Sequence, residues 1–82
     1  MAITRDEMIK ILAEADPLGL IFDGGPEDEY AREADSILGL VGVPTLTEIT
    51  GIFAVSFSDP GACRRETARW IVEEMTRRDT SR

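Results

Sequence analysis

The fold is decided by residues 16–30, DPLGLIFDGGPEDEY, which separate two stretches of helical pattern. This segment contains two of the four prolines and three of the seven glycines, so a continuous helix through it is disfavoured. Its first half carries four large apolar side chains: Leu18, Leu20, Ile21 and Phe22. Leaving such a side chain in water costs roughly 1.5 to 3 kcal/mol. We therefore expect one long ordered crossover loop over residues 16–29, with its apolar half folded over the core.

The residues before this segment show the pattern of an amphipathic helix. Thr4 and Glu7 have the spacing of a capping box, in which the hydroxyl and the carboxylate each accept a hydrogen bond from a free backbone amide. Apolar residues then recur at helical spacing: Met8, Ile11, Leu12 and Ala15. Pro17 disfavours the α conformation at Asp16. The sequence thus predicts a helix over residues 5–15.

The acidic end of the segment leads into a second helical pattern. Pro26 suits the first turn of a helix, where its missing amide hydrogen costs nothing, and Asp23 is a candidate cap. Three acids would follow in that turn, near the positive end of the helix dipole: Glu27, Asp28 and Glu29. The apolar stripe comprises Tyr30, Ala34, Ile37, Leu38 and Val41. Gly42 is the expected terminator, although Gly39 indicates an early end or a close helix neighbour.

Two further helices are predicted in the second half of the chain. Thr45 and Glu48 repeat the capping-box spacing, and apolar residues then lie broadly on one side of a helix: Leu46, Ile49, Ile52, Phe53 and Phe57. Residues 52–57 also fit a strand by propensity, but the sequence offers no second strand to pair with it. Asp59 is a candidate cap for the last helix, with Pro60 at its first position. The buried side of that helix is predicted to contain Ala68, Ile71, Val72 and Met75.

These elements predict an all-α fold, a small four-helix bundle formed by one domain over residues 1–82. The polar tail over residues 76–82 is expected to fray. Residues 1–6 lack the pattern of a signal peptide, and no apolar run approaches the roughly 20 residues that span a bilayer. The single cysteine cannot form an internal disulfide. We therefore expect a cytoplasmic protein with no membrane partner.

The net charge of −7 is distributed unevenly along the chain. Residues 1–59 contain twelve acids and three bases, whereas residues 60–82 contain six arginines and four acids. An acidic surface repels nucleic acid and attracts a basic protein partner, although it also simply keeps a small protein soluble. In the last helix, glutamates precede arginines by four residues: Glu73 and Arg77, Glu74 and Arg78. This spacing favours a salt-bridged solvent face over a nucleic-acid stripe.

The chain lacks the usual groups of a catalytic site. It contains no histidine, so the commonest general base near neutral pH and the commonest transition-metal ligand are both missing. Cys63 is expected in a first helical turn beside two arginines, but it has no histidine partner, and a partly buried residue is the better interpretation. The acids after Asp23 do not match a calcium-binding loop, and Gly24-Gly25 lacks the lysine of a phosphate loop. We therefore predict no enzyme activity, no cofactor and no metal site.

Two strings at a characteristic separation carry a resemblance to a known family. DPLGL at residues 16–20 and PEDEY at residues 26–30, with the apolar pattern that continues to Phe57, resemble the YugE-like family of small acidic bacterial proteins of unknown function. The resemblance covers roughly residues 6–58. It implies an all-α fold and a likeness to small bacterial toxin-immunity proteins, and it supplies no catalytic residue. Ala15 stands where the family often has tryptophan.

The candidate partner-binding residues surround the predicted start of the second helix: Asp23, Glu27, Asp28, Glu29, Tyr30 and Glu33. Tyr30 is either a core anchor bonded to the Asp16–Pro17 turn, which we favour, or an exposed aromatic in an acid-rimmed face. We predict a non-enzymatic binding protein, with an immunity protein that covers the basic active site of a toxin, such as a nuclease domain, as the leading hypothesis. The alternative is a structural or regulatory interaction module, including a homodimer formed through the last two helices.

Overall fold

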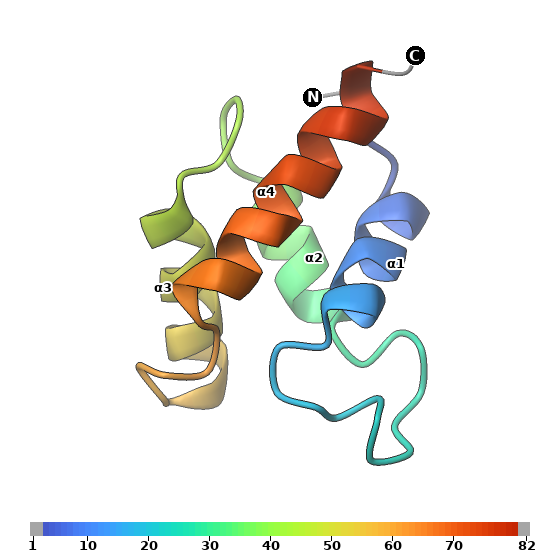
Figure 1. Cartoon of the computed structure of the whole chain (residues 1–82), viewed down its shortest axis with the longest axis vertical. Helices are drawn as coiled ribbons and strands as arrows, with labels where there is room; N and C mark the ends of the chain where they lie inside the picture. The colour runs from blue at the N-terminus through green and yellow to red at the C-terminus, as the bar shows by residue number, and fades with distance from the viewer. Residues whose placement is uncertain (1–2, 81–82) are drawn as a thin grey trace.

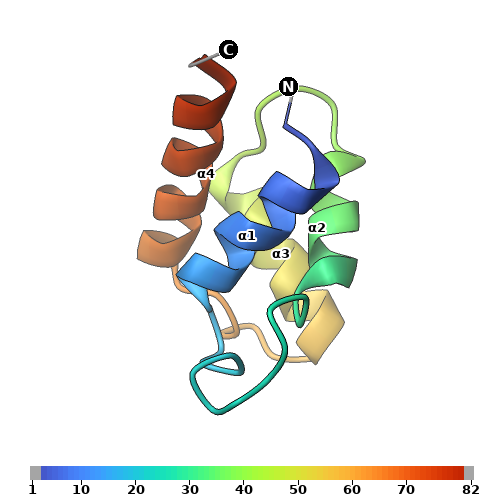
Figure 2. The ribbon, with the colours of Figure 1, turned by 90° about the vertical axis from the view of Figure 1, so that its right-hand side faces the viewer.

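A computed structural model of the chain describes residues 3–80, which form four α-helices and no strand (Figure 1). The helices are α1 (Arg5–Ala15), α2 (Ala31–Leu38), α3 (Leu46–Phe57) and α4 (Arg65–Thr80). The chain runs up and down, so that residues 16–30 and 58–64 lie at one end of the bundle and residues 39–45 at the other (Figures 1 and 2). The predicted small all-α bundle is confirmed.

Each helix packs against two others around a single core. α1 and α3 both contact α2 and α4, and they do not contact each other within the described part of the chain. The largest fully buried side chains come from all four helices and from the loop before α2: Tyr30, Phe53, Met8, Ile11, Leu12, Ile37, Ile49 and Ile71. The apolar half of the long loop packs against this core through Leu18, Leu20 and Ile21, whereas Phe22 is 91% exposed.

The starts of α1 and α3 follow the local sequence signals. Thr4 Oγ1 accepts from the Glu7 amide at 3.1 Å, and Glu7 Oε1 accepts from the Thr4 amide at 3.1 Å. The second capping box has the same two bonds, between Thr45 and Glu48, at 3.1 and 2.9 Å. Residues 52–57 are helical, as favoured, because the capped helix continues through them to Phe57.

The predicted start of α2 is wrong by about one turn. Residues 26–30 form two tight turns instead, closed by bonds from the Glu29 amide to the Pro26 carbonyl at 3.1 Å and from the Ala31 amide to the Asp28 carbonyl at 3.0 Å. Asp23 therefore caps no helix, and the three acids precede α2 rather than occupying its first turn. The helix also ends early, with Gly39 as its C-cap, so Val41 is 99% exposed instead of completing the apolar stripe.

The predicted start of α4 at Asp59 and Pro60 is also wrong. Asp59 Oδ1 accepts from the Gly61 amide at 2.9 Å, so this carboxylate closes a turn and α4 begins only at Arg65. Cys63 consequently lies before the helix and is 4% exposed. At the other end, α4 continues to Thr80, so the predicted fraying is not found for residues 76–80. Residues 81 and 82, which that prediction also covered, lie outside the described part of the chain.

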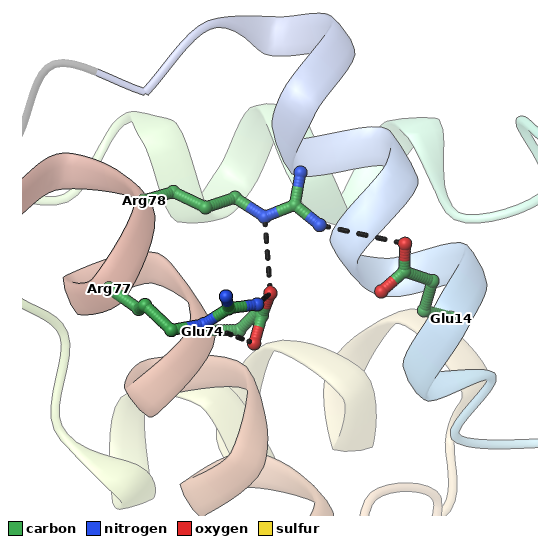
Figure 3. A network of polar contacts seen from close by, with 4 residues as sticks. All are labelled: Glu14, Glu74, Arg77 and Arg78. Atoms are coloured by element: carbon green, nitrogen blue, oxygen red, sulfur yellow. Dashed lines mark hydrogen bonds and ion pairs between the residues drawn. The ribbon is translucent and has the colours of Figure 1, made fainter. Parts of the chain in front are cut away.

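A cluster of charged side chains joins α4 to α1 (Figure 3). Glu74 is buried and accepts hydrogen bonds from Arg77 and Arg78. Arg78 also reaches Glu14 of α1 at 3.5 Å. The hydrogen bond from Arg77 is the main reason that the pKa of Glu74 is held below its usual value. The predicted pair of Glu74 and Arg78 is thus confirmed. Through Arg78, it also connects α4 to Glu14 of α1.

Two glycines give a matched test of this packing. A Cβ atom on Gly25 would lie 2.7 Å from the carbonyl oxygen of Leu20, whereas a Cβ on Gly51 of α3 would meet nothing within 4 Å. We expect Gly25→Ala to destabilise the protein by about 1–3 kcal/mol, because backbone must move. Gly51→Ala should stabilise it by about 0.5–1 kcal/mol, because alanine favours a helix interior. Urea unfolding followed by circular dichroism measures both, and a Gly25→Ala variant as stable as Gly51→Ala would refute the close packing of the loop.

Candidate functional site

The long loop is held to the bundle by the hydroxyl of Tyr30. This hydroxyl donates to Asp16 Oδ1 at 2.6 Å and accepts from the Leu18 amide at 3.2 Å and the Leu20 amide at 3.4 Å. The Asp16 carboxylate also accepts from the amides of Ile21 and Phe22, at 3.1 and 3.0 Å. The favoured interpretation of Tyr30 as a core anchor bonded to the turn at Asp16 is therefore confirmed.

Burial and hydrogen bonding shift the ionisation of both partners in this contact. Burial and the bond to Asp16 raise the pKa of Tyr30 to about 12. For Asp16, burial acts to raise the pKa, but the bonds from Tyr30 and from backbone amides outweigh it and hold the pKa below its ordinary value. The contact is thus between a neutral phenol and a carboxylate at neutral pH, which makes it a strong, charge-assisted hydrogen bond.

Two of the predicted partner-binding residues are not on the exposed surface. Tyr30 is 0% exposed, so its interpretation as an exposed aromatic in a binding face is wrong. Glu33 is 3% exposed, because it lies on the inner side of α2 rather than on its solvent face. The other four predicted residues are exposed: Asp23, Glu27, Asp28 and Glu29. Their carboxylates form no hydrogen bond or ion pair with residues 3–80.

Two adjoining grooves bring most of these acids together. The larger groove, of about 540 Å³, runs between the loop, α2 and the end of α3, and the smaller, of about 420 Å³, runs between the loop and α1. Arg5 and Asp28 line both grooves. We call the acids that line them the acidic face: Asp6, Glu27, Asp28, Glu29, Glu33 and Asp35. Asp23 lines neither groove and lies outside this face.

One ion pair bridges the acidic face. Arg5 Nε of α1 donates to Asp35 Oδ1 of α2 at 2.7 Å, and this bond is the main cause that lowers the pKa of Asp35. Both side chains are more than half exposed, so water screens the pair and its contribution to stability is small. Its effect is to fix the two helices on either side of the grooves. The six acids of the face outnumber the three cations that line the same grooves: Arg5, Lys10 and Arg32.

The acidic face can attract a cation. Among residues 3–80, no group of three or more acidic or cysteine side chains is arranged to hold a metal ion. Cys63 lies outside the face, and burial raises the pKa of its thiol to about 11, so it is protonated at neutral pH. Its predicted place in the first turn of α4 is wrong, because the residue precedes that helix, but the favoured interpretation of Cys63 as a buried residue is confirmed.

A third groove, of about 450 Å³, is mainly apolar and lies between α2 and α3. Leu40, Ile52 and Val55 line it, and Val55 is 82% exposed. The sequence pattern did not predict this groove. It placed Ile52 on the buried side of its helix and residues 39–41 within α2. It also missed Arg5, Asp35 and Phe57 in the larger groove, since no local spacing relates these three residues.

The fold and its surface define a small all-α bundle with an acidic face. No helix in the described part of the chain is both long and apolar enough to cross a membrane. Searches among protein families, curated proteins and solved structures find no match to this chain.

The single tyrosine allows a direct test of its buried hydrogen bond. The pKa of Tyr30 is raised from 10.0 to about 12, so the folded state favours the neutral phenol. The stability that this confers is complete below about pH 10 and is lost as the pH rises through about 12. When tyrosinate absorbance is followed with pH, the midpoint of ionisation should therefore lie near pH 12 or coincide with alkaline unfolding. In urea, where the protein is unfolded, the midpoint should lie near pH 10. Ionisation near pH 10 while the helical signal is intact would contradict the contact.

Removing the same hydroxyl tests its structural role. Tyr30→Phe removes the side-chain donor of Asp16, which keeps its two backbone donors, and leaves the Leu18 amide without an acceptor. We therefore expect a loss of about 1–3 kcal/mol at pH 7 in urea unfolding. The pKa of Asp16 is lowered in the folded state, so the ionised carboxylate contributes stability above about pH 4. This contribution is lost as the pH falls through the pKa that Asp16 has in the folded state. The stability difference between Tyr30→Phe and the wild type should therefore shrink at pH 3. Ser56→Ala removes an exposed hydroxyl and should change stability little.

Proposed function

We propose that the protein is an acidic, non-enzymatic binding protein of the bacterial cytoplasm, and specifically an immunity protein that neutralises a cognate toxin by covering its basic active site. The observation that carries this proposal is the acidic face. Its loop carboxylates, Glu27, Asp28 and Glu29, are exposed and form no internal ion pair within residues 3–80. Their negative charge is therefore available to a partner.

The frame beneath these carboxylates supports the proposal. The loop that carries them is fixed at one side by the Asp16–Tyr30 contact and at the other by the packing of Leu18, Leu20 and Ile21 on the core. A fixed loop loses little conformational freedom when a partner binds, so less of the interaction free energy is spent on ordering. Charge held in a fixed arrangement also steers a basic partner into productive orientation and raises the association rate.

The available side chains favour binding over catalysis. The chain has no histidine, and its one cysteine is buried with a raised pKa. A basic nuclease domain is a suitable partner, because the arginines and lysines that bind nucleic-acid phosphates would meet the acidic face directly. The resemblance to the YugE-like family, and the likeness of that family to immunity proteins, also support this proposal.

The alternative function is a structural or regulatory module that forms a homodimer. One observation favours it, on α2 and α3 rather than on the predicted last two helices: the apolar groove between α2 and α3, with Val55 exposed in its lining. Two copies joined there would cover Leu40 and Val55 and leave the acidic face free. Sedimentation across a range of protein concentrations distinguishes the two functions, because an immunity protein binds its toxin without needing to self-associate.

Neutralising two acids of the face provides the main test. Glu27→Gln with Glu29→Gln should lower the affinity for the toxin encoded beside the gene of this protein about tenfold or more, mainly through slower association. The matched control is Glu66→Gln with Glu73→Gln, which removes two exposed glutamate charges from α4 and should change the affinity less than about twofold. Titration calorimetry at low and high salt measures both, and the wild-type affinity should fall as salt is added.

Two results would refute the proposal. In the first, the control pair weakens binding as much as the loop pair, which would mean that total charge alone attracts the partner. In the second, cells that make the wild-type protein gain no protection from the neighbouring toxin. Either result would favour the interaction module instead.

A further inference from the structure

Glu33 is a buried residue at the wall of the larger groove. It is 3% exposed, and it forms no hydrogen bond or ion pair with any residue of the described part of the chain. Among residues 3–80, no fully buried side-chain oxygen lacks a hydrogen-bond partner, so the carboxylate oxygens of Glu33 open onto the groove. A carboxylate beside protein walls attracts a cation more strongly than one in open water. Glu33 is therefore positioned to pair with a cation that enters the groove.

Neither of the two arginines that line this groove fills this role. Arg5 lines the groove, but its guanidinium is bound to Asp35 through two contacts, at 2.7 and 3.3 Å. Arg32 also lines the groove, but it is exposed and pairs with no acid in residues 3–80. As the helical neighbour of Glu33, Arg32 projects about 100° away around the axis of α2, so it does not face that carboxylate.

An aromatic ring forms part of the groove close to these acids. Phe57, at the end of α3, lines the same groove as Glu33 and is partly exposed there. Its ring is stacked on Phe53, with centroids 6.2 Å apart and planes 6° from parallel, and it meets the edge of Tyr30 at 6.4 Å. These contacts restrict the ring, so the part of Phe57 that borders the groove is held in place.

We propose that this groove binds one arginine side chain of the basic partner, with the guanidinium paired to Glu33 and placed against Phe57. A guanidinium is planar, so it pairs with a carboxylate through two parallel hydrogen bonds and can stack flat on an aromatic ring. A lysine ammonium is attracted to both groups as a compact point charge, without the two parallel bonds or the stacking. The volume of about 540 Å³ lies within the range of sites that hold a small ligand group. This inference rests on the proposed function and names the contact that the partner makes.

The test uses the intact protein and a minimal probe, N-acetyl-arginine amide, in which the guanidinium is the only charge. In NMR titrations, the amide shifts should centre on Glu33 and Phe57, and the lysine analogue should bind at least threefold more weakly. Glu33→Gln should weaken arginine binding about tenfold, whereas Glu73→Gln, a matched charge removal on the exposed face of α4, should leave it unchanged. Phe57→Leu should reduce the preference for arginine over lysine, because it removes the aromatic ring and leaves only the pairing with Glu33.

The thermal unfolding midpoint of each variant is measured first. Glu33→Gln should unfold close to the wild-type midpoint, since glutamine conserves the volume of the side chain. If Glu33→Gln does not fold, Phe57→Leu decides the test. The proposal is overturned if arginine and lysine bind equally to the wild type, if Glu33→Gln binds as the wild type does, or if the shifts spread over the whole acidic face.

The outcome also separates this inference from the proposed function. If Glu33→Gln binds the toxin normally while Glu27→Gln with Glu29→Gln does not, the arginine site is wrong and the immunity function stands. If arginine binds at Glu33 and the toxin does not bind at all, the site stands and the immunity function is wrong.

Discussion

The hydrogen bond between Tyr30 and Asp16 is the constraint on which the rest of the structure depends. It joins the residue after α1 to the residue before α2, so it closes the long loop on itself at 2.6 Å. The same carboxylate binds the backbone amides of Ile21 and Phe22, which turns the intervening chain back toward the core. The loop acids of the acidic face are consequently held in one place beside α1 and α2.

Local signals predicted the fold well wherever a helix boundary was set by neighbouring residues. The capping boxes of α1 and α3 pair residues three apart, so both helix starts were correct. The starts of α2 and α4 were wrong for a shared reason. At each, a proline with an aspartate shortly before it suggested a capped first turn, but the structure uses Pro26 and Asp59 in tight turns. The burial of Tyr30 and Cys63, just after those turns, favours a tight turn over a first helical turn at each place. That burial depends on tertiary packing, which the local sequence does not show.

The candidate site was predictable in composition but not in geometry. The sequence singled out six residues, and four of them are exposed acids, as a run of charge in a loop indicates. It did not reveal that Glu33 faces inward, because a short helix of eight residues carries polar positions on both sides of its apolar stripe. Nor did it relate Arg5 to Asp35, since the two are thirty residues apart and meet only when α1 packs on α2.

The two buried glutamates of the chain show why the acidic face is more than a solvated surface. Glu74 is 8% exposed and is compensated by Arg77 and Arg78. Glu33 is 3% exposed and has no such compensation from residues 3–80. The same fold thus pairs one carboxylate internally where it joins α4 to α1, and leaves the other open to the groove that it borders. Because a ligand that binds only the folded state stabilises it by mass action, a cation supplied by a partner would both complete the groove and stabilise the bundle around it.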